Sequence, residues 1–431
     1  MIVFPFCSEN LKILLGGSAQ GKYIYGYLKT LGAKTCVLEK EYIDKDFTVD
    51  YQKFYCRSFK DGGKFTKRIH FFTEFFNTDK FKYALINNDV CFLSESYLGF
   101  VVIRPIEDQD GQPFIGRTIL KTYPASESKK RCFITGEYTS SLFGIPLVIK
   151  SLPFQAQDQG VSACATIALW AAIHPLRSLF GIPGHSPAEI TEMSTSLPAP
   201  FRKFPSDGLT MEQMVNYIKL IDLDVEYIDA INDDVIQTAV KAYIRAGLPI
   251  IANLNLKHET LPGRHAVVIS GHKEDKMGNV VELYVHDDGI GPYSRVLPNG
   301  DFKHWKNEWN DHGYEVELEK LLVPIYPKVR LPFCRMYVEY SRIKADLGSH
   351  ISDFDLELYL TSVGEYKRFL IGNSIKDKTE ILTKSLPRFL WIVRFIHKNQ
   401  HIGDQIYDGT SVYVTKLISV EFCNNSLVNT H

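Results

Sequence analysis

The order of hydrophobic patterns between residues 151 and 290 constrains the fold of this chain more than any other feature. An uncharged apolar run from Ala163 to Ile173 follows a polar turn and is typical of a buried helix. Helical patterns continue to Ala246, and three extended apolar runs then occupy residues 249–256, 265–270 and 280–286. A polar hairpin segment at 273–279 joins the last two runs. A helix followed by an antiparallel sheet predicts an α+β domain.

Capping residues give the expected boundaries of the helices in this region. Ser162 is a suitable N-cap for the first helix, which we expect to end near His174 because Pro175 follows it. Further helices are predicted over residues 186–194, 210–221 and 233–246, and Gly247 closes the last of them.

The length and composition of the chain indicate a soluble protein of several domains. At 431 residues, two or three domains are expected if each takes roughly 150 residues. The hydrophobic fraction is 45% and the charged fraction 23%, as in ordinary globular proteins. Because 49 basic residues oppose 50 acidic ones, the formal charge of −1 creates no global field that would attract nucleic acid or an anionic membrane. Neither is expected as a partner.

Turn-forming residues divide the chain into three predicted parts. Gly144 and Pro153 flank a short extended run, and prolines at 324, 327 and 332 mark the end of the following unit. We expect an N-terminal α/β accessory domain at 1–145, a catalytic domain at 146–328 and a C-terminal extension at 329–431. In the first part, residues 11–15, 83–86 and 97–105 are predicted to be extended, and residues 23–31 to form a helix.

The cysteine pattern and the N-terminus favour a cytoplasmic location. Eight cysteines are spread along the chain without a CxxC pair, so neither a zinc ribbon nor a dithiol redox motif is predicted. This low density favours reduced thiols. The first ten residues lack a basic segment and include Glu9, which disfavours a secretory signal. The longest apolar run is far too short to cross a bilayer.

Cys164, His265 and Asp287 form the strongest functional pattern of the sequence. Cys164 lies at the start of a predicted helix, where amide dipoles favour a thiolate over the neutral thiol. His265 opens a predicted strand, and Asp287 ends the next one. Their chemistry assigns Cys164 as nucleophile, His265 as general base and acid, and Asp287 as the group that orients the imidazole. Each residue alone is more typical of an inert core position, so the catalytic interpretation depends on all three together.

The other expected members of the site are an oxyanion donor and a choice between two aspartates. Besides the backbone N–H of the cysteine, an oxyanion hole needs a side-chain donor near the nucleophile. Gln159, five residues before the nucleophile, is the first candidate, and Gln157 in the same turn is the second. Asp287 is favoured over Asp288 because it continues the alternation of its strand, whereas Asp288 should point away.

The order of glutamine, cysteine at a helix start, histidine opening a strand and aspartate ending the next strand resembles the papain-like fold. The likeness is closest to the C39-like branch of cysteine peptidases, in which the third residue is an aspartate, and it covers about residues 150–325. It implies a papain-like catalytic core, with the nucleophile helix packed on an antiparallel sheet, and a thiol peptidase that needs no cofactor. Papain-type enzymes have Cys-Gly-Ser-Cys-Trp at the nucleophile, whereas Ala163 and Ala165 flank Cys164 here, and the Gln159 spacing is one residue shorter.

The predicted reaction moves an acyl group from a peptide or isopeptide carbonyl to Cys164 and then to water, so the expected partner is a protein or peptide substrate. Two alternatives stay open. A transglutaminase or N-acyltransferase uses the same three residues, with an amine in place of water. A catalytically inactive papain-like binding module would leave Cys164 no more reactive than a free thiol. The sequence defines neither the substrate nor the oligomeric state.

Two further patterns are expected to be structural. The run from Gly16 to Lys22 imitates a phosphate-binding loop after an apolar strand, but Tyr23 stands where a magnesium-binding Ser or Thr is needed. The aromatics around His70 have helical spacing, and we expect them in the core rather than stacked on bases.

The histidines between residues 258 and 286 lack the spacing that zinc sites favour, so no metal is predicted. The segment Asp301–Trp305 could shield the histidine and aspartate with its tryptophan. It is equally typical of an amphipathic surface strand, and it is not included in the predicted site.

Overall fold

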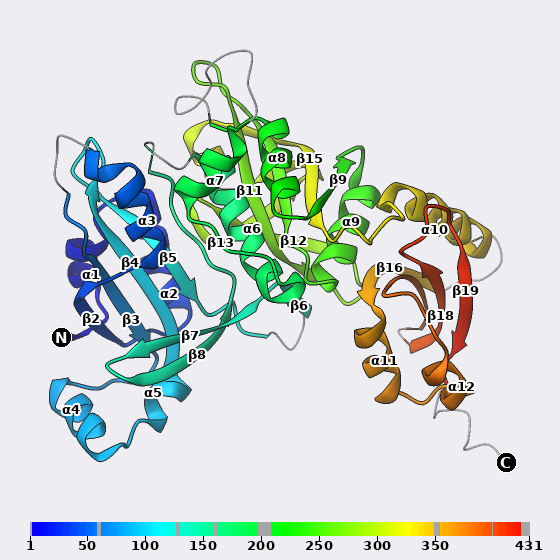
Figure 1. The fold of residues 1–431 in the computed structure, drawn as a ribbon, viewed down its shortest axis with the longest axis horizontal. Coiled ribbons are helices and arrows are strands. Elements are labelled where there is room, and N and C mark those ends of the chain that lie inside the picture. Colours follow the sequence, from blue (N-terminus) through cyan, green and yellow to red (C-terminus); the bar gives the residue numbers. More distant parts are fainter. Residues whose placement is uncertain are drawn as a thin grey trace.

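Three parts follow one another along the long axis of the molecule, in the order of the sequence (Figure 1). The computed structural model describes residues 2–57, 62–125, 130–158, 160, 163–196, 208–348, 354–398 and 400–423. Within these residues every paired strand is antiparallel, and helices cover the sheets. The chain is therefore α+β, as predicted, with several antiparallel sheets, one of which closes into a barrel.

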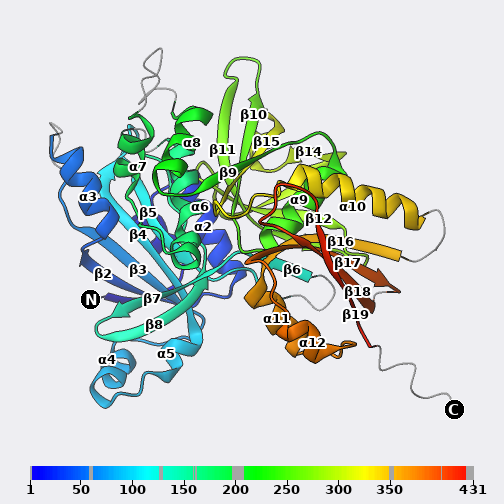
Figure 2. The same cartoon turned by 45° about the vertical axis from the view of Figure 1, so that its right-hand side comes forward.

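The N-terminal part is a five-stranded sheet in the order β1-β2-β3-β4-β5. A two-stranded hairpin of β7 and β8 lies across it (Figure 2). The elements are β1 (Ile2–Pro5), α1 (Ser8–Leu15), α2 (Ala19–Thr30), β2 (Thr35–Tyr42), α3 (Lys45–Lys53), η1 (Tyr55–Arg57), β3 (Thr66–Phe72), α4 (Thr78–Asn87), α5 (Cys91–Ser96), β4 (Tyr97–Glu107), β5 (Pro113–Leu120), β7 (Gly136–Leu142) and β8 (Ile145–Ser151).

Alternation along the strands gives this sheet two buried faces. Val37 and Phe72 face the β7–β8 hairpin, whereas Cys36, Leu38 and Phe71 join the large core that continues into the central part. The predicted α/β arrangement of this part is wrong, because all its strand pairs are antiparallel.

Two predicted strands in the N-terminal part are helices. In α1, Leu11 and Leu15 are buried while Ile13 is 80% exposed. In α4, Phe81 and Ala84 are buried while Ile86 is 83% exposed. Burial at a spacing of three or four residues identifies the helical period, which the short apolar runs at 11–15 and 83–86 do not reveal by themselves. The predicted helical spacing around His70 is also wrong, because those aromatics lie on β3, although His70, Phe71 and Phe72 are buried as expected.

The central part contains a closed barrel. β10 pairs with both β11 and β15, so the strands from β10 to β15 form a ring, to which β9 and β6 add at the outside. Its elements are β6 (Lys130–Phe133), α6 (Cys164–Phe180), α7 (Pro187–Ser194), α8 (Met211–Leu220), β9 (Asp224–Asp229), α9 (Asp233–Arg245), β10 (Ile250–Lys257), β11 (Gly263–Glu274), β12 (Val280–Asp287), β13 (Gly291–Asn299), β14 (Asp301–Lys306), η2 (Glu308–His312) and β15 (Glu315–Ile325).

The predicted elements of the central part are confirmed, with different limits for the first helix. The helices predicted at 186–194, 210–221 and 233–246 are α7, α8 and α9, and the three predicted strands are β10, β11 and β12. The N-cap of α6 is Ala163, and the proposed N-cap Ser162 lies outside the described residues. The helix continues through Pro175 to Phe180, because Ile173 and Leu176 are buried in the core on either side of the proline.

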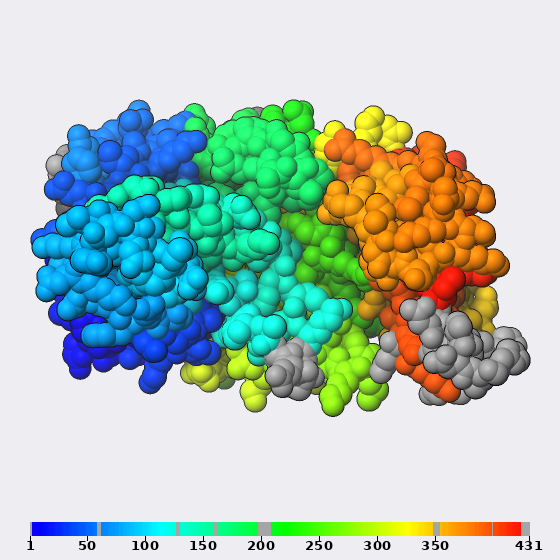
Figure 3. Space-filling view, turned by 90° about the horizontal axis from the view of Figure 1, so that it is seen from below, coloured from blue at the N-terminus to red at the C-terminus, as the bar shows by residue number. Residues whose placement is uncertain are grey.

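The C-terminal part is a four-stranded sheet in the order β16-β17-β18-β19. Its elements are α10 (Phe333–Gly348), β16 (Phe354–Ser362), α11 (Val363–Ile371), α12 (Lys378–Thr383), β17 (Phe389–His397), β18 (Gln400–Asp408) and β19 (Lys416–Glu421). One face of the sheet packs on α11 and α12, and the other, which includes Trp391, joins the core of the central part. The surface is hollowed where these two parts meet (Figure 3). In the described part of the chain, no helix is long and apolar enough to cross a membrane.

Candidate active site

The three predicted catalytic residues come from three elements of the central part. Cys164 is the first residue of α6, a helix that packs on β11 and β10. His265 lies near the start of β11, opposite Leu254 of β10. Asp287 ends β12, where a shift in register separates its pairing with Gly291 from the preceding ladder. Because β11 and β12 are neighbours in the barrel, the imidazole and the carboxylate reach each other directly.

Asp287 receives hydrogen bonds on both of its carboxylate oxygens. His265 Nε2 lies 2.9 Å from Oδ1, and the backbone N–H of Gly289 donates to the same oxygen at 2.9 Å. Trp309 Nε1 donates to Oδ2 at 2.8 Å. Burial by itself would raise the pKa of Asp287, but the charge of His265 and these hydrogen bonds hold it below its ordinary value. Asp287 is therefore an ionised carboxylate at neutral pH.

Trp309 shields the histidine and aspartate pair. Its ring lies edge-on to the His265 imidazole, with the centroids 5.4 Å apart, and it comes from η2 rather than from β14. Trp305, the tryptophan considered in the sequence, is buried and donates to the carbonyl of Phe302. The sequence offers two tryptophans four residues apart, and nothing in their spacing shows which one reaches the site.

His265 connects the carboxylate to the thiol. Burial of the ring opposes its positive charge, but Asp287, Asp288 and a hydrogen bond with the Cys164 side chain together raise the pKa of His265 well above its ordinary value. Since Nε2 is engaged by Asp287, Nδ1 is the ring nitrogen left for the thiol. An imidazole beside a sulfur at a helix N-terminus is the arrangement that a nucleophilic thiol needs.

Asp288 also lies near the imidazole, contrary to the expectation that it points away. Its Oδ1 is 3.8 Å from His265 Nε2, which is too long for a hydrogen bond. Burial, together with the charge of Asp287, raises the pKa of Asp288 to about 7, although His265 acts in the opposite direction. The Asp288 carbonyl accepts a hydrogen bond from Gln20 of α2 at 3.0 Å, so the N-terminal part contacts the turn that carries both aspartates.

The two candidate oxyanion donors are placed differently. Gln159 lies outside the described residues, so its predicted role stays a prediction. Gln157 is partly buried and lines a small cavity of about 120 Å³, together with Ser18 and Gln20 of the N-terminal part. The first N–H groups of α6 have no acceptor within their own helix, and they are suited to bind an oxyanion beside the Cys164 sulfur.

A buried ion-pair cluster, which the sequence analysis missed, holds the turn before Cys164. Arg104 of β4 donates to Asp158 Oδ2 at 2.8 Å, and its other terminal nitrogen lies 3.9 Å from Asp50. Asp158 directly precedes Gln159, and its Oδ1 accepts from the backbone N–H of Gly160 at 3.2 Å. A lone arginine inside the apolar run of β4 was the available sequence signal, because buried arginines are almost always paired.

Comparison with known protein families and with curated proteins finds no match for this chain. The site is therefore interpreted from its own geometry and chemistry. In space, the His265 imidazole lies between the Cys164 thiol and the ionised Asp287 carboxylate. The Trp309 ring covers the imidazole and the carboxylate.

Proposed function

We propose that this protein is a papain-like cysteine peptidase of the C39-like type, which hydrolyses a peptide or isopeptide bond. One observation carries the proposal: His265 is held by Asp287, which is itself held by Trp309, and the same imidazole interacts with the Cys164 thiol at a helix start. A structural histidine needs no such arrangement. The closed barrel beside α6 also supports a papain-like core.

In the proposed reaction, the Cys164 thiolate attacks the carbonyl carbon of the substrate and pushes its electrons onto the oxygen. The N–H groups at the start of α6 stabilise this oxyanion. The His265 imidazolium gives its proton to the leaving amine, and a thioester remains on Cys164. Neutral His265 then takes a proton from water, the hydroxide attacks the thioester, and the carboxylic acid product leaves as the thiolate and the imidazolium form again. Asp287 keeps the ring oriented throughout.

The proposal includes a protein or peptide substrate and a cytoplasmic location, and it requires no cofactor. A transglutaminase or acyltransferase would use the same first half of the reaction. The two differ only in whether water or an amine attacks the thioester.

Acylation by p-nitrophenyl acetate tests the proposed nucleophile without knowledge of the substrate. We expect a burst of nitrophenolate equal to the amount of enzyme, with the acetyl group on Cys164 by mass spectrometry, followed by slower turnover. Cys164→Ala should abolish the burst, whereas Cys423→Ser, which changes an exposed thiol, should leave it intact. Equal release from Cys164→Ala would refute the proposal.

The fate of the acetyl group separates hydrolysis from transfer. Turnover of the acetyl-enzyme is measured with and without a primary amine such as glycine methyl ester. A peptidase should release mainly acetate at millimolar amine. Predominant formation of the N-acetyl product would instead assign the protein to the acyltransferases.

A further inference from the structure

A second group of reactive side chains lies away from the candidate active site, where β6 pairs with β11. Cys132 stands opposite His272 and Lys130 opposite Glu274 in this antiparallel ladder. Residues that face each other, or that lie two apart on a strand, project from the same side of a sheet. The thiol, the imidazole and the Glu274 carboxylate therefore converge, and their ligand atoms all lie within 4.8 Å of one another.

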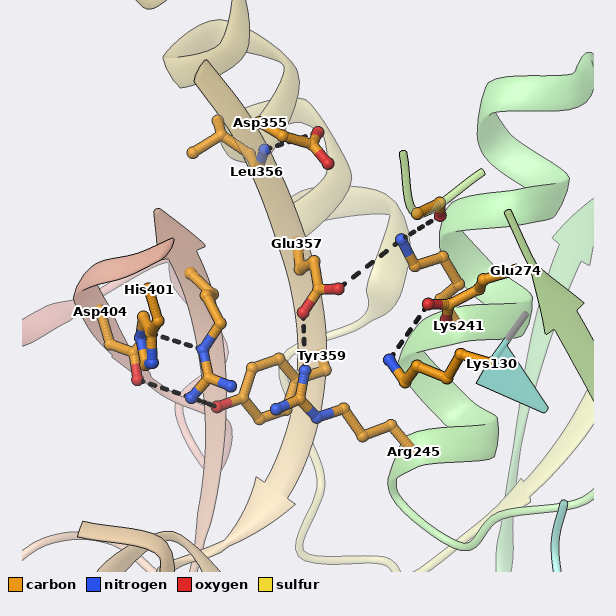
Figure 4. Close-up of polar contacts among 12 residues, drawn as sticks. Lys130, Lys241, Arg245, Glu274, Asp355, Leu356, Glu357, Tyr359, His401 and Asp404 are labelled. Carbon is orange, nitrogen blue, oxygen red and sulfur yellow. Dashed lines mark hydrogen bonds and ion pairs between the residues drawn. The ribbon is translucent and has the colours of Figure 1, made fainter. Parts of the chain in front are cut away.

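This group lines a cleft of about 370 Å³ between the barrel and the C-terminal part. Figure 4 shows Lys130, Lys241 and Glu274 on one side of it, and Glu357 and Tyr359 of β16 on the other. The group is therefore buried at its base and reachable from the cleft. It shares no residue with the candidate active site.

His272 is the member of the group whose bonding is incomplete. Its side chain is buried, with 2% exposed, and its Nε2 lies 2.8 Å from Glu274 Oε1. Among the residues that the structure describes, Nδ1 has no hydrogen-bond partner. If the ring proton sits on Nδ1, Nε2 turns its lone pair toward the Glu274 carboxylate, and a cation between this nitrogen and the carboxylate satisfies both groups.

We propose that Cys132, His272 and Glu274 form a binding site for a divalent metal ion of the zinc class, with an open coordination position that faces the cleft. Sulfur, nitrogen and oxygen donors together are the set that zinc prefers. Two ligand atoms of a tetrahedral zinc ion lie about 3.5 Å apart, so side-chain movements of about 1 Å close the site. Binding releases the Cys132 proton to solvent, and the thiolate and the carboxylate balance the charge of the ion.

The cations around the cleft are engaged with partners outside the proposed ligand set, except for Lys130. Lys241 donates to the carbonyl of Gly278 at 2.9 Å, and Arg245 pairs with Glu357 at 2.8 Å. Arg394 pairs with Asp404 at 3.0 Å. Lys130 bonds to Glu274 at 3.0 Å, but its side chain is largely exposed, so it can turn into solvent when the carboxylate binds the metal.

Cobalt(II) is the probe for this site, because a thiolate ligand gives it a charge-transfer absorption. The titration uses the full chain under a non-thiol reductant, both unchanged and as Cys164→Ala, so that the catalytic thiol cannot be the source. We expect one cobalt ion per chain, with the thiolate band in both proteins. Cys132→Ser should abolish the band, Glu274→Gln should weaken binding at least about tenfold, and Cys423→Ser should change nothing.

Absence of the band from the Cys164→Ala protein, or its persistence in Cys132→Ser, would overturn the proposal. A second measurement uses only the unchanged chain, so its result does not depend on whether a variant folds. Zinc should slow the alkylation of Cys132 in the unchanged chain while Cys423 reacts at the same rate as before, as mapped by mass spectrometry. Equal alkylation of Cys132 with and without zinc would equally refute the site.

Discussion

At the residue scale, the candidate active site depends on the balance of charge around His265. Asp287 is the group that holds the imidazole positive in a buried place. Because the folded pKa of His265 is raised, its contribution to stability is complete below the pKa of an unfolded histidine. It is lost as the pH rises through the higher folded value.

Replacing Asp287 by Asn tests this balance. The substitution keeps the shape of the side chain but removes the charge, so burial should lower the pKa of His265. At neutral pH we expect Cys164 to react with iodoacetamide at least about tenfold more slowly, which corresponds to one pKa unit of the histidine. The remaining rate should rise with pH as the thiol itself loses its proton, instead of staying high at acidic pH.

Asp288→Asn is the matched control for that substitution. Asp288 makes no hydrogen bond to His265, so its loss should change the alkylation rate of Cys164 by less than about threefold. A larger effect from Asp288→Asn than from Asp287→Asn would show that the wrong aspartate has been assigned.

Trp309→Phe removes the indole N–H that bonds to Asp287 while it keeps an aromatic cover. We expect several-fold slower acylation of Cys164 and a lower pKa for the histidine in the pH profile, since the carboxylate is held less firmly. Trp305→Phe removes another buried indole donor from the same region and should lower only the unfolding midpoint. Unchanged kinetics in Trp309→Phe would contradict the orienting role.

The sequence predicted the residues whose chemistry is unusual but not those that support them. Cys164, His265 and Asp287 were predicted because a thiol, an imidazole and a carboxylate stand at element boundaries in the order that a cysteine nucleophile system requires. Trp309 and Arg104 act through contacts with residues far away in the chain, and these contacts exist only after the barrel has closed. Gln159 stays a prediction.

At the element scale, the sequence predicted helices that begin with a recognised capping residue better than it predicted short apolar runs. The helices α7, α8 and α9 carry N-cap side chains at Ser186, Thr210 and Asn232, and two of them have complete capping boxes. The helix α1 has no side-chain cap, and the apolar run at 83–86 covers only the end of α4, so both runs were interpreted as strands. Only tertiary packing decides which period such a run follows.

A buried carboxylate joins three elements at the edge of the barrel. Glu226 of β9 accepts hydrogen bonds from Tyr243 of α9 and from the backbone N–H of Phe333, which begins α10. Burial raises the pKa of Glu226 to about 7. The folded state therefore binds a proton that the unfolded state has already lost, and stability falls as the pH rises from about 4.5 to about 7.

Glu226→Gln should remove this pH dependence, because its amide mimics the protonated acid. In urea unfolding at pH 5 and pH 8, the variant should lose less stability between the two pH values than the unchanged protein, by up to about 3 kcal/mol. Glu421→Gln, at an exposed site on β19, serves as the control. Parallel losses in the unchanged protein and in Glu226→Gln would contradict a raised pKa.

At the scale of the whole molecule, the three parts share one continuous hydrophobic core. It contains Leu28 of α2, Leu169 of α6 and Trp391 of β17, and β6 adds residues before 146 to the central sheet. The predicted domain limits at 145 and 328 stay predictions. Arg104 contacts Asp158 in the turn before Cys164, and Gln20 contacts the turn that carries Asp287 and Asp288. The N-terminal part therefore contacts the candidate active site at two places.

Arg104→Met tests whether the N-terminal part supports the active-site turn. The substitution leaves Asp50 and Asp158 buried without their shared cation, which should cost about 3–5 kcal/mol in unfolding experiments. Adding Asp50→Asn and Asp158→Asn removes the uncompensated charges and should restore most of the stability. If Arg104→Met costs less than about 1 kcal/mol, the cluster does not anchor the turn.

The central claim is that Cys164 is an activated thiol, and its alkylation rate tests this most directly. Iodoacetamide labelling of all eight cysteines is followed by mass spectrometry over a range of pH. We predict that near pH 6 Cys164 reacts at least about tenfold faster than the exposed Cys423, and that His265→Ala abolishes the difference. A Cys164 that reacts no faster than Cys423, with a rate unchanged by His265→Ala, would contradict the account and leave an inactive binding module as the explanation of the fold.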